Sequence, residues 1–110
     1  MTIVATTIVH PNPGVNWDDV QKQLKRATGL ASKHGAENVT VLVNMVGGQG
    51  TNAIGLLVTA EDWAAYGQIQ QGLTTDPDFQ GLTIDAGKIA TWENYVSQTI
   101  EALTVIAGRK

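Results

Sequence analysis

Cysteine is absent from this chain of 110 residues, which excludes disulfides, thiolate metal sites and cysteine nucleophiles. Charged residues are also few, at 15% of the chain, and the formal net charge is −3. The seven Lys and Arg residues are scattered along the sequence. A nucleic-acid partner would need clustered basic charge to displace counterions, so we expect none.

Long apolar runs are missing as well. No stretch approaches the roughly 20 apolar residues that a membrane-spanning helix needs, and no basic segment precedes the apolar residues Ile3 and Val4. We therefore expect no membrane partner. Together with the absence of cysteine, this favours a cytoplasmic location. The length fits one domain over residues 1–110, large enough to bury a modest core.

The segments that are present alternate in the order strand, helix, strand, strand, helix, strand. Residues rich in β-branched side chains predict strands at 2–10, 39–46, 52–58 and from about 90 to 103, although 91–103 could also be drawn as a helix. Asn16 and Thr59 are predicted to cap the two helices, the first helix ends at Gly35, and Asp76-Pro77 restarts a short helix. This order predicts an α+β, ferredoxin-like fold, in which one antiparallel sheet of strand order 4-1-3-2 carries helices on one face.

Both faces of the predicted sheet are apolar. In the second strand Val39, Val41, Val43 and Met45 share one face, while Leu42 and Val46 lie on the other. In the first strand Ile3, Ala5 and Val9 lie opposite Val4 and Ile8. One layer of helices can cover only one face. The simplest cover for the second face is the same face of another copy, which predicts a homodimer.

Several segments recur in a recognisable order along the chain. An early strand ends in a Pro/Gly turn, an Ala-rich amphipathic helix follows, and then come residues 43–48, 61–66, 76–79 and a closing strand. In this order the chain resembles the dimeric α/β-barrel superfamily, including its antibiotic-biosynthesis-monooxygenase-like, NIPSNAP-like and stress-responsive members. The resemblance covers nearly the whole sequence and implies a dimeric α/β barrel that encloses a cavity.

Cofactor-free monooxygenases and haem-degrading relatives of this superfamily use Asn, Trp and His side chains around that cavity. This chain has those residue types, but its second predicted helix contains no His, where a haem ligand would be expected. The resemblance therefore does not imply haem. No His, Asp and Glu spacing suggests a metal site, so we expect neither a metal nor a cofactor.

The strand order gathers candidate site residues at one rim of the sheet. The ends of the first two strands and the starts of the last two bring His10, Asn44, Asn52 and Trp92 together, and Trp17 begins its helix from the same rim. An imidazole, two carboxamides and two indoles could bind a planar polar ligand. We take His10 and Asn44 as catalytic candidates. The predicted ligand-binding residues are Trp17, Asn44, Asn52, Trp63, Tyr66 and Trp92.

Each candidate also has a structural interpretation. His10 could be a solvated residue at a strand end, and the Asn44 carboxamide could find a backbone partner. Trp63, Tyr66 and Phe79 follow helical spacing, which is more typical of core residues.

Two functions therefore stay open, together with a purely structural one. The favoured one is a homodimeric barrel protein that binds a small apolar or aromatic molecule. The alternative is a cofactor-independent monooxygenase-like enzyme acting on an aromatic or polyketide-like substrate, in which His10 and Asn44 polarise or deprotonate that substrate. A module that only dimerises is the third interpretation.

Overall fold

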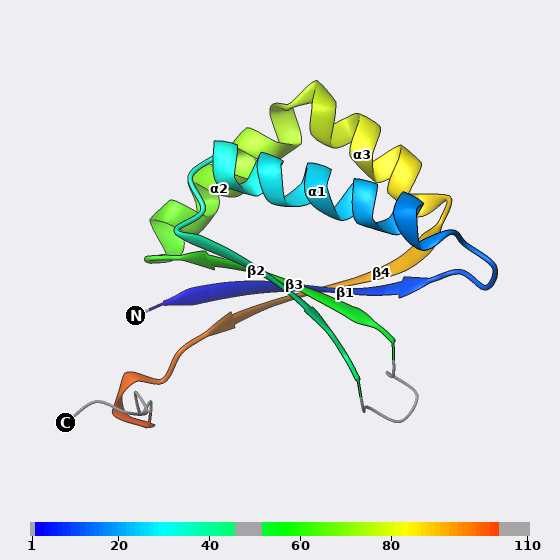
Figure 1. Cartoon of the computed structure of the whole chain (residues 1–110). Helices are drawn as coiled ribbons and strands as arrows, with labels where there is room; N and C mark the ends of the chain where they lie inside the picture. Colours follow the sequence, from blue (N-terminus) through cyan, green and yellow to red (C-terminus); the bar gives the residue numbers. More distant parts are fainter. Residues whose placement is uncertain (1, 46–51, 104–110) are drawn as a thin grey trace.

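A computed structural model describes residues 2–45 and 52–103 of the chain (Figure 1). The elements are, in chain order, β1 (Ile3–Pro11), α1 (Trp17–Lys33), β2 (Asn38–Val43), β3 (Ile54–Ala60), α2 (Trp63–Thr75), α3 (Pro77–Gly87), β4 (Ala90–Gln98) and the 3₁₀ turn η2 (Glu101–Leu103). No helix within these described ranges is long and apolar enough to cross a membrane.

The four strands form one antiparallel sheet in the order β2-β3-β1-β4, as the sequence predicts. All three helices lie on one face of this sheet in Figure 1. The predicted ferredoxin-like α+β fold is therefore confirmed. We call the face that carries the helices the helix face and the opposite one the outer face. Val9 pairs with Ile54 and with Trp92, so these residues lie on the helix face.

The predicted element boundaries shift by a few residues. The segment after residue 90 is a strand, but it ends at Gln98, and Glu101–Leu103 forms a 3₁₀ turn instead of continuing it. The second strand ends at Val43 and the third begins at Ile54, both closer to the sheet centre than predicted. Residues 46–51 lie outside the described residues, and they include Val46 and the whole connection that the sequence predicts between the second and third strands, at residues 47–51.

Two of the three predicted helix caps are correct. The Asn16 side chain accepts a hydrogen bond of 2.9 Å from the Asp18 N–H, and Asp76 caps α3 in front of Pro77. Thr59 is not a cap, because β3 continues through it to Ala60. The Asp62 carboxylate caps α2 instead, accepting a hydrogen bond of 2.8 Å from the Ala65 N–H. An exposed carboxylate at this position also matches the positive end of the helix dipole.

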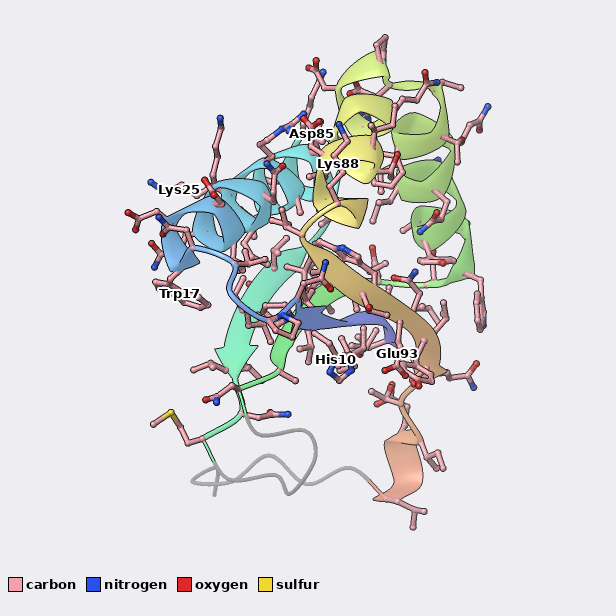
Figure 2. The ribbon with its side chains drawn as sticks, turned by 90° about the vertical axis from the view of Figure 1, so that its right-hand side faces the viewer. His10, Trp17, Lys25, Asp85, Lys88 and Glu93 are labelled. Carbon is pink, nitrogen blue, oxygen red and sulfur yellow. The ribbon has the colours of Figure 1, made fainter. Side chains whose placement is uncertain are left out.

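Three small apolar clusters hold the helices on the sheet. Val20 and Leu24 of α1 pack on Val9 and Ile54, whereas Ile69 of α2 packs on Ile3 and Ala60. The third cluster, Leu30, Leu82 and Ala86, joins α1 to α3. An ion pair of 2.9 Å between Arg26 Nη1 and Asp85 Oδ2 supports the same contact between α1 and α3 (Asp85 is labelled in Figure 2).

The α1 helix leaves the edge strand β2 partly uncovered. Val41 and Val43 lie on the helix face but are 43% and 48% exposed, because α1 packs over β1 and β3. In the single chain the helices therefore leave these two valines, which the sequence places on one apolar face, partly open to solvent. They line an open groove beside Trp17.

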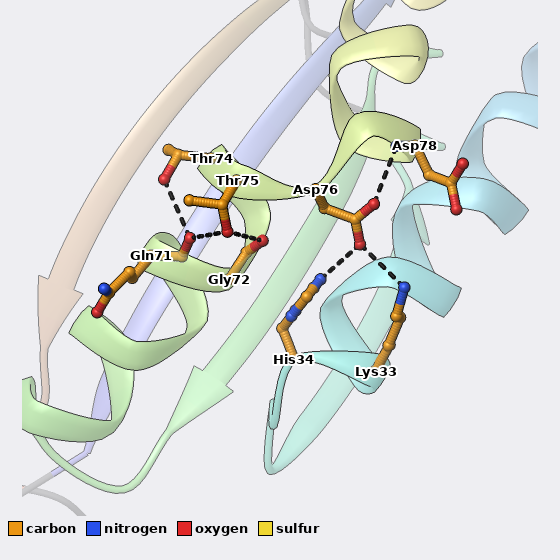
Figure 3. Close-up of polar contacts among 8 residues, drawn as sticks. All are labelled: Lys33, His34, Gln71, Gly72, Thr74, Thr75, Asp76 and Asp78. Carbon is orange, nitrogen blue, oxygen red and sulfur yellow. Dashed lines mark hydrogen bonds and ion pairs between the residues drawn. The ribbon is translucent and has the colours of Figure 1, made fainter.

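The Asp76 carboxylate joins the ends of the three helices (Figure 3). Its Oδ2 accepts hydrogen bonds from His34 Nε2 at 2.7 Å and from Lys33 Nζ at 3.1 Å, and its Oδ1 accepts from the Asp78 N–H at 2.9 Å. Only 7% of the side chain is exposed. These bonds, of which the one from His34 has the largest effect, lower the pKa of Asp76 from 3.8 to about 2.

Gly72 of α2 gives a direct test of this helix junction. A Cβ atom at Gly72 would collide with the His34 ring, whereas a Cβ atom at Gly67 of the same helix would meet no atom within 4 Å. We expect Gly72→Ala to lower the free energy of unfolding by about 1–3 kcal/mol through overpacking. Gly67→Ala, the matched control, should raise it by up to about 1 kcal/mol through helix propensity. Urea unfolding measures both, and equal effects of the two changes would contradict the contact.

Asp76→Asn tests the charge of the junction. The depressed pKa means that the folded state keeps the carboxylate ionised at a pH where the unfolded chain protonates it. Its stabilising contribution is therefore present above pH 3.8 and disappears as the pH falls through about 2. Asparagine can still cap α3 but carries no charge. We expect the variant to be less stable at neutral pH, and its unfolding free energy should fall less steeply on acidification. If the unfolding free energies of variant and wild type fall in parallel on acidification, the charge of Asp76 does not contribute to stability.

Candidate functional site

A cavity of about 470 Å³ lies between the helices and the sheet. Small side chains create it, because Ala5 of β1, Ala27 and Ala31 of α1 and Ala86 of α3 all line it. Larger residues at these positions would close the space between the two layers. We call this space the helix–sheet cavity. Its volume falls within the range of about 300–1,000 Å³ that is usual for small-molecule sites.

Aromatic side chains from three elements surround the helix–sheet cavity. They are Tyr66 of α2, Phe79 of α3 and Trp92 of β4, whereas Tyr95 borders the cavity from β4 with its hydroxyl bonded to Glu93 on the opposite face of the sheet. The Trp92 indole Nε1–H donates a hydrogen bond of 3.0 Å to the Ala86 carbonyl oxygen. Because this bond satisfies the only polar group of the indole, Trp92 offers the cavity an apolar ring.

One polar pair lies at the sheet side of the cavity. Thr7 and Asn94 are cross-strand partners on the helix face, and the Thr7 hydroxyl donates a hydrogen bond of 2.7 Å to Asn94 Oδ1. The Asn94 Nδ2 group is therefore the part of this carboxamide that can donate to a ligand. Since β4 is an edge strand and its Asn94 and Val96 side chains are exposed, the cavity opens at this edge of the sheet.

Charged side chains do not line the helix–sheet cavity in the described part of the chain. Its polar lining comes from hydroxyl and carboxamide groups such as those of Thr7, Gln70, Thr83 and Asn94. Within residues 2–45 and 52–103, no group of three or more His, Asp or Glu side chains lies close enough to hold a metal ion. The cavity is thus suited to binding by apolar contact and neutral hydrogen bonds.

The predicted aromatic residues divide between cavity and surface. Tyr66 and Trp92 line the helix–sheet cavity. Trp63 is 48% exposed and lies beside it, packing edge-to-face on Tyr66 with ring centroids 6.0 Å apart. Its indole Nε1 donates a hydrogen bond of 3.1 Å to Gln98 Oε1, which links the start of α2 to the end of β4.

The predicted rim residues from the β2–β3 side lie away from this cavity. Asn44 and Asn52 do come together, because the Asn52 N–H donates to the Asn44 carbonyl oxygen at 2.8 Å and the Asn44 N–H donates to Ala53 at 2.9 Å. Asn52 adopts a left-handed conformation with φ of 70°, which asparagine tolerates well. Trp17 lines the open groove beside Val41 and Val43, at the start of α1 (Figure 2).

His10 lies on the outer face. Its Nε2 is 2.7 Å from Glu93 Oε1, and the Tyr95 hydroxyl donates a hydrogen bond of 2.7 Å to Glu93 Oε2. Figure 2 shows His10 and Glu93 side by side. The bonds from Tyr95 and then His10 lower the pKa of Glu93, and the same carboxylate raises the pKa of Tyr95. His10 pairs with Thr91, one residue before Trp92, so the two rings project from opposite faces of the sheet.

The rim predicted from topology is therefore split between several surfaces. The structure brings His10, Asn44, Asn52 and Trp92 to the same end of the sheet, but it does not bring their side chains into one site. Thr7, Phe79 and Asn94 line the cavity and were not among the predicted ligand-binding residues. The sequence does carry a signal for Asn94, because it follows Trp92 by two residues in a strand and so shares its face.

No protein-family model matches the sequence, and no curated protein matches it significantly. Solved structures do match it over nearly the whole chain. A NIPSNAP-like domain protein from Burkholderia xenovorans aligns with a TM-score of 0.72 and 13% identity, covering 96% of this chain and 90% of its own. SnoaB, a cofactor-independent oxygenase from Streptomyces nogalater, aligns with a TM-score of 0.64 and 16% identity, covering 93% and 94%.

A dimeric ferredoxin-like protein of unknown function from Thermobifida fusca aligns with a TM-score of 0.67 and 13% identity, covering 90% and 92%. The chain shares their ferredoxin-like fold. The resemblance seen in the sequence is thereby confirmed at the level of the ferredoxin-like fold. At these identities the alignments establish the fold and not the activity.

Proposed function

We propose that this ferredoxin-like protein binds a small apolar or aromatic molecule in the helix–sheet cavity and works as a homodimer. The observation that carries the proposal is the cavity of about 470 Å³, with three aromatic walls and few polar groups. Such a combination is typical of sites that bury most of a small ligand. A core that served only for stability would fill this space.

The outer face supports the pairing of two copies. Val4, Ile8, Leu42, Leu57 and Tyr95 project from it, and Leu42 and Tyr95 are 51% and 53% exposed in the single chain. A solvent-exposed apolar sheet face is a liability in water. Packing against the same face of a second copy would cover it and form an α/β barrel. The Thermobifida fusca neighbour, which is described as dimeric, supports this pairing.

Cavity filling tests the binding proposal. Ala27→Phe places a ring in the helix–sheet cavity, whereas Ser32→Phe places the same ring on the exposed side of α1. With the uncharged fluorescent probe N-phenyl-1-naphthylamine, we expect wild type and Ser32→Phe to bind with similar affinity. Ala27→Phe should lose at least about tenfold in affinity, since it occupies the probe's volume. Equal binding by all three proteins would place the probe outside this cavity.

A charged substitution tests the homodimer. Ile8→Asp would place a second carboxylate beside that of Glu93, its cross-strand neighbour, in the proposed interface, and burying such a like-charge pair costs several kcal/mol. We expect sedimentation velocity at micromolar concentration to give a dimer for wild type and a monomer for Ile8→Asp. Ile84→Asp on α3, at a position that is 62% exposed, is the matched control and should stay dimeric. A monomeric wild type, or a dimeric Ile8→Asp, would rule out pairing through the outer face.

A cofactor-independent oxygenase is the second candidate, favoured by the similarity of the fold to SnoaB. In such an enzyme the reacting ring would lie in the helix–sheet cavity, near the Thr7–Asn94 pair. His10 and Asn44, the catalytic candidates from the sequence, do not line that cavity. Oxygen uptake with 1-naphthol, abolished by Ala27→Phe but not by Ser32→Phe, would favour the enzyme over a binding protein.

A further inference from the structure

We propose that the helix–sheet cavity selects an uncharged, planar ligand whose carbonyl-type oxygen accepts a hydrogen bond from Asn94 Nδ2. This inference rests on the proposed function, because it names the class of molecule that the same cavity takes.

The lining excludes charged ligands. None of the residues that line the cavity within the described ranges is Asp, Glu, Lys, Arg or His. A carboxylate or an ammonium group entering the cavity would lose its hydration without gaining a counter-ion, which costs several kcal/mol. On the helices, Arg26 is already bonded to Gln23 and to Asp85. An uncharged molecule has no charged group to dehydrate, so it enters without this penalty.

The hydrogen-bond donors of the lining point to Asn94. The Thr7 hydroxyl donates to Asn94 Oδ1, the Trp92 indole donates to the Ala86 carbonyl, and the Thr83 hydroxyl donates to the Gln80 carbonyl at 2.8 Å. Each of these donors is already used inside the protein. The Thr7 bond also fixes the orientation of the Asn94 carboxamide, so that its Nδ2 group is held in place before a ligand arrives.

Two other residues of the cavity also carry polar groups. Gln70 of α2 and Tyr66 of the same helix line it as well. Among the described residues, however, Asn94 is the carboxamide of the cavity that receives a hydrogen bond from a second cavity residue. A donor fixed in this way favours an acceptor oxygen on the ligand, such as that of a ketone, an aldehyde or a quinone.

The apolar walls favour a planar ring. Tyr66, Phe79 and Trp92 come from three different elements, and Trp92 presents an indole whose N–H is already bonded. Aromatic rings pack on one another in offset or edge-to-face arrangements with a gain beyond the buried area alone. The inferred ligand class is therefore an uncharged aromatic or conjugated carbonyl compound.

Three naphthalene probes of similar shape separate these requirements. 2-Acetylnaphthalene is uncharged and carries a carbonyl oxygen, 2-isopropenylnaphthalene replaces that oxygen with a methylene group, and 2-naphthoate carries a charged carboxylate. Titration followed by the fluorescence of the protein gives the affinity of each. We expect the ketone to bind about tenfold more tightly than the alkene, as one hydrogen bond predicts. The carboxylate should bind at least about tenfold more weakly than the ketone.

Two variants assign the preference to Asn94. Asn94→Leu keeps the size of the side chain and removes the donor, so the ratio of ketone to alkene affinity should fall close to one. Thr83→Val is the matched control, because it removes a hydroxyl from the same cavity whose hydrogen bond goes to its own helix. It should keep the wild-type ratio. A variant that damages the fold would weaken both probes together and leave the ratio unchanged, so the ratio reports the donor itself.

The outcomes separate this inference from the proposed function. If the probes bind wild type but not Ala27→Phe, the cavity binds ligands. If, in addition, the carboxylate or the alkene binds with the same affinity as the ketone, the inferred selection by charge or by Asn94 is wrong. An unchanged ratio in Asn94→Leu, measured where the variant binds the alkene as tightly as wild type does and is therefore intact, has the same meaning. If Ala27→Phe leaves the binding of all three probes unaltered, the cavity is not a binding site and the proposed function falls with the inference.

Discussion

The Asp76 carboxylate is the interaction on which the layer of helices depends. It receives hydrogen bonds from the end of α1, through Lys33 and His34, and from the first turn of α3, while the backbone N–H of Asp76 donates to the Leu73 carbonyl oxygen of α2. At the other end of the molecule, Val20 and Leu24 anchor α1 to the sheet. Between these two anchors, the facing surfaces of the helices and the sheet carry alanine side chains. The cavity exists because the layer is held at both ends and carries small side chains in the middle.

The alternation of side chains along β1 and β4 separates two tasks. Thr7 and Asn94 project into the helix–sheet cavity, whereas their neighbours Ile8 and Glu93 project from the outer face. A shift of one residue in the pairing of these strands would exchange the two sets. The register between β1 and β4 therefore decides both what the cavity can bind and what the outer face offers to a second copy.

Much of this fold follows from local sequence signals, and most of the site does not. The Asn16 and Asp76 caps, the break at Pro77 and the strand order could all be predicted, because each depends on neighbouring residues or on simple topology. Thr59 was mistaken for a cap because the sequence does not reveal that β3 continues two residues further. The Thr7–Asn94 bond joins residues 87 positions apart, so only the register of the folded sheet shows it. His10 and Trp92 were correctly placed at one end of the sheet, but the face that each side chain takes depends on the same register.

The distribution of ionisable groups agrees with this division of the sheet. The outer face carries His10, Glu93 and Tyr95, and the Glu93 carboxylate accepts hydrogen bonds on both of its oxygens. A carboxylate with both oxygens bonded tolerates removal from water far better than an isolated one. This cluster is therefore compatible with the packing of a second sheet on the outer face. The helix–sheet cavity, in contrast, is lined in the described chain by neutral groups. The Glu93 carboxylate thus lies on the face where a second copy would cover it, with its hydrogen bonds already made. It lies on the opposite side of the sheet from the cavity in which an uncharged ligand would bind.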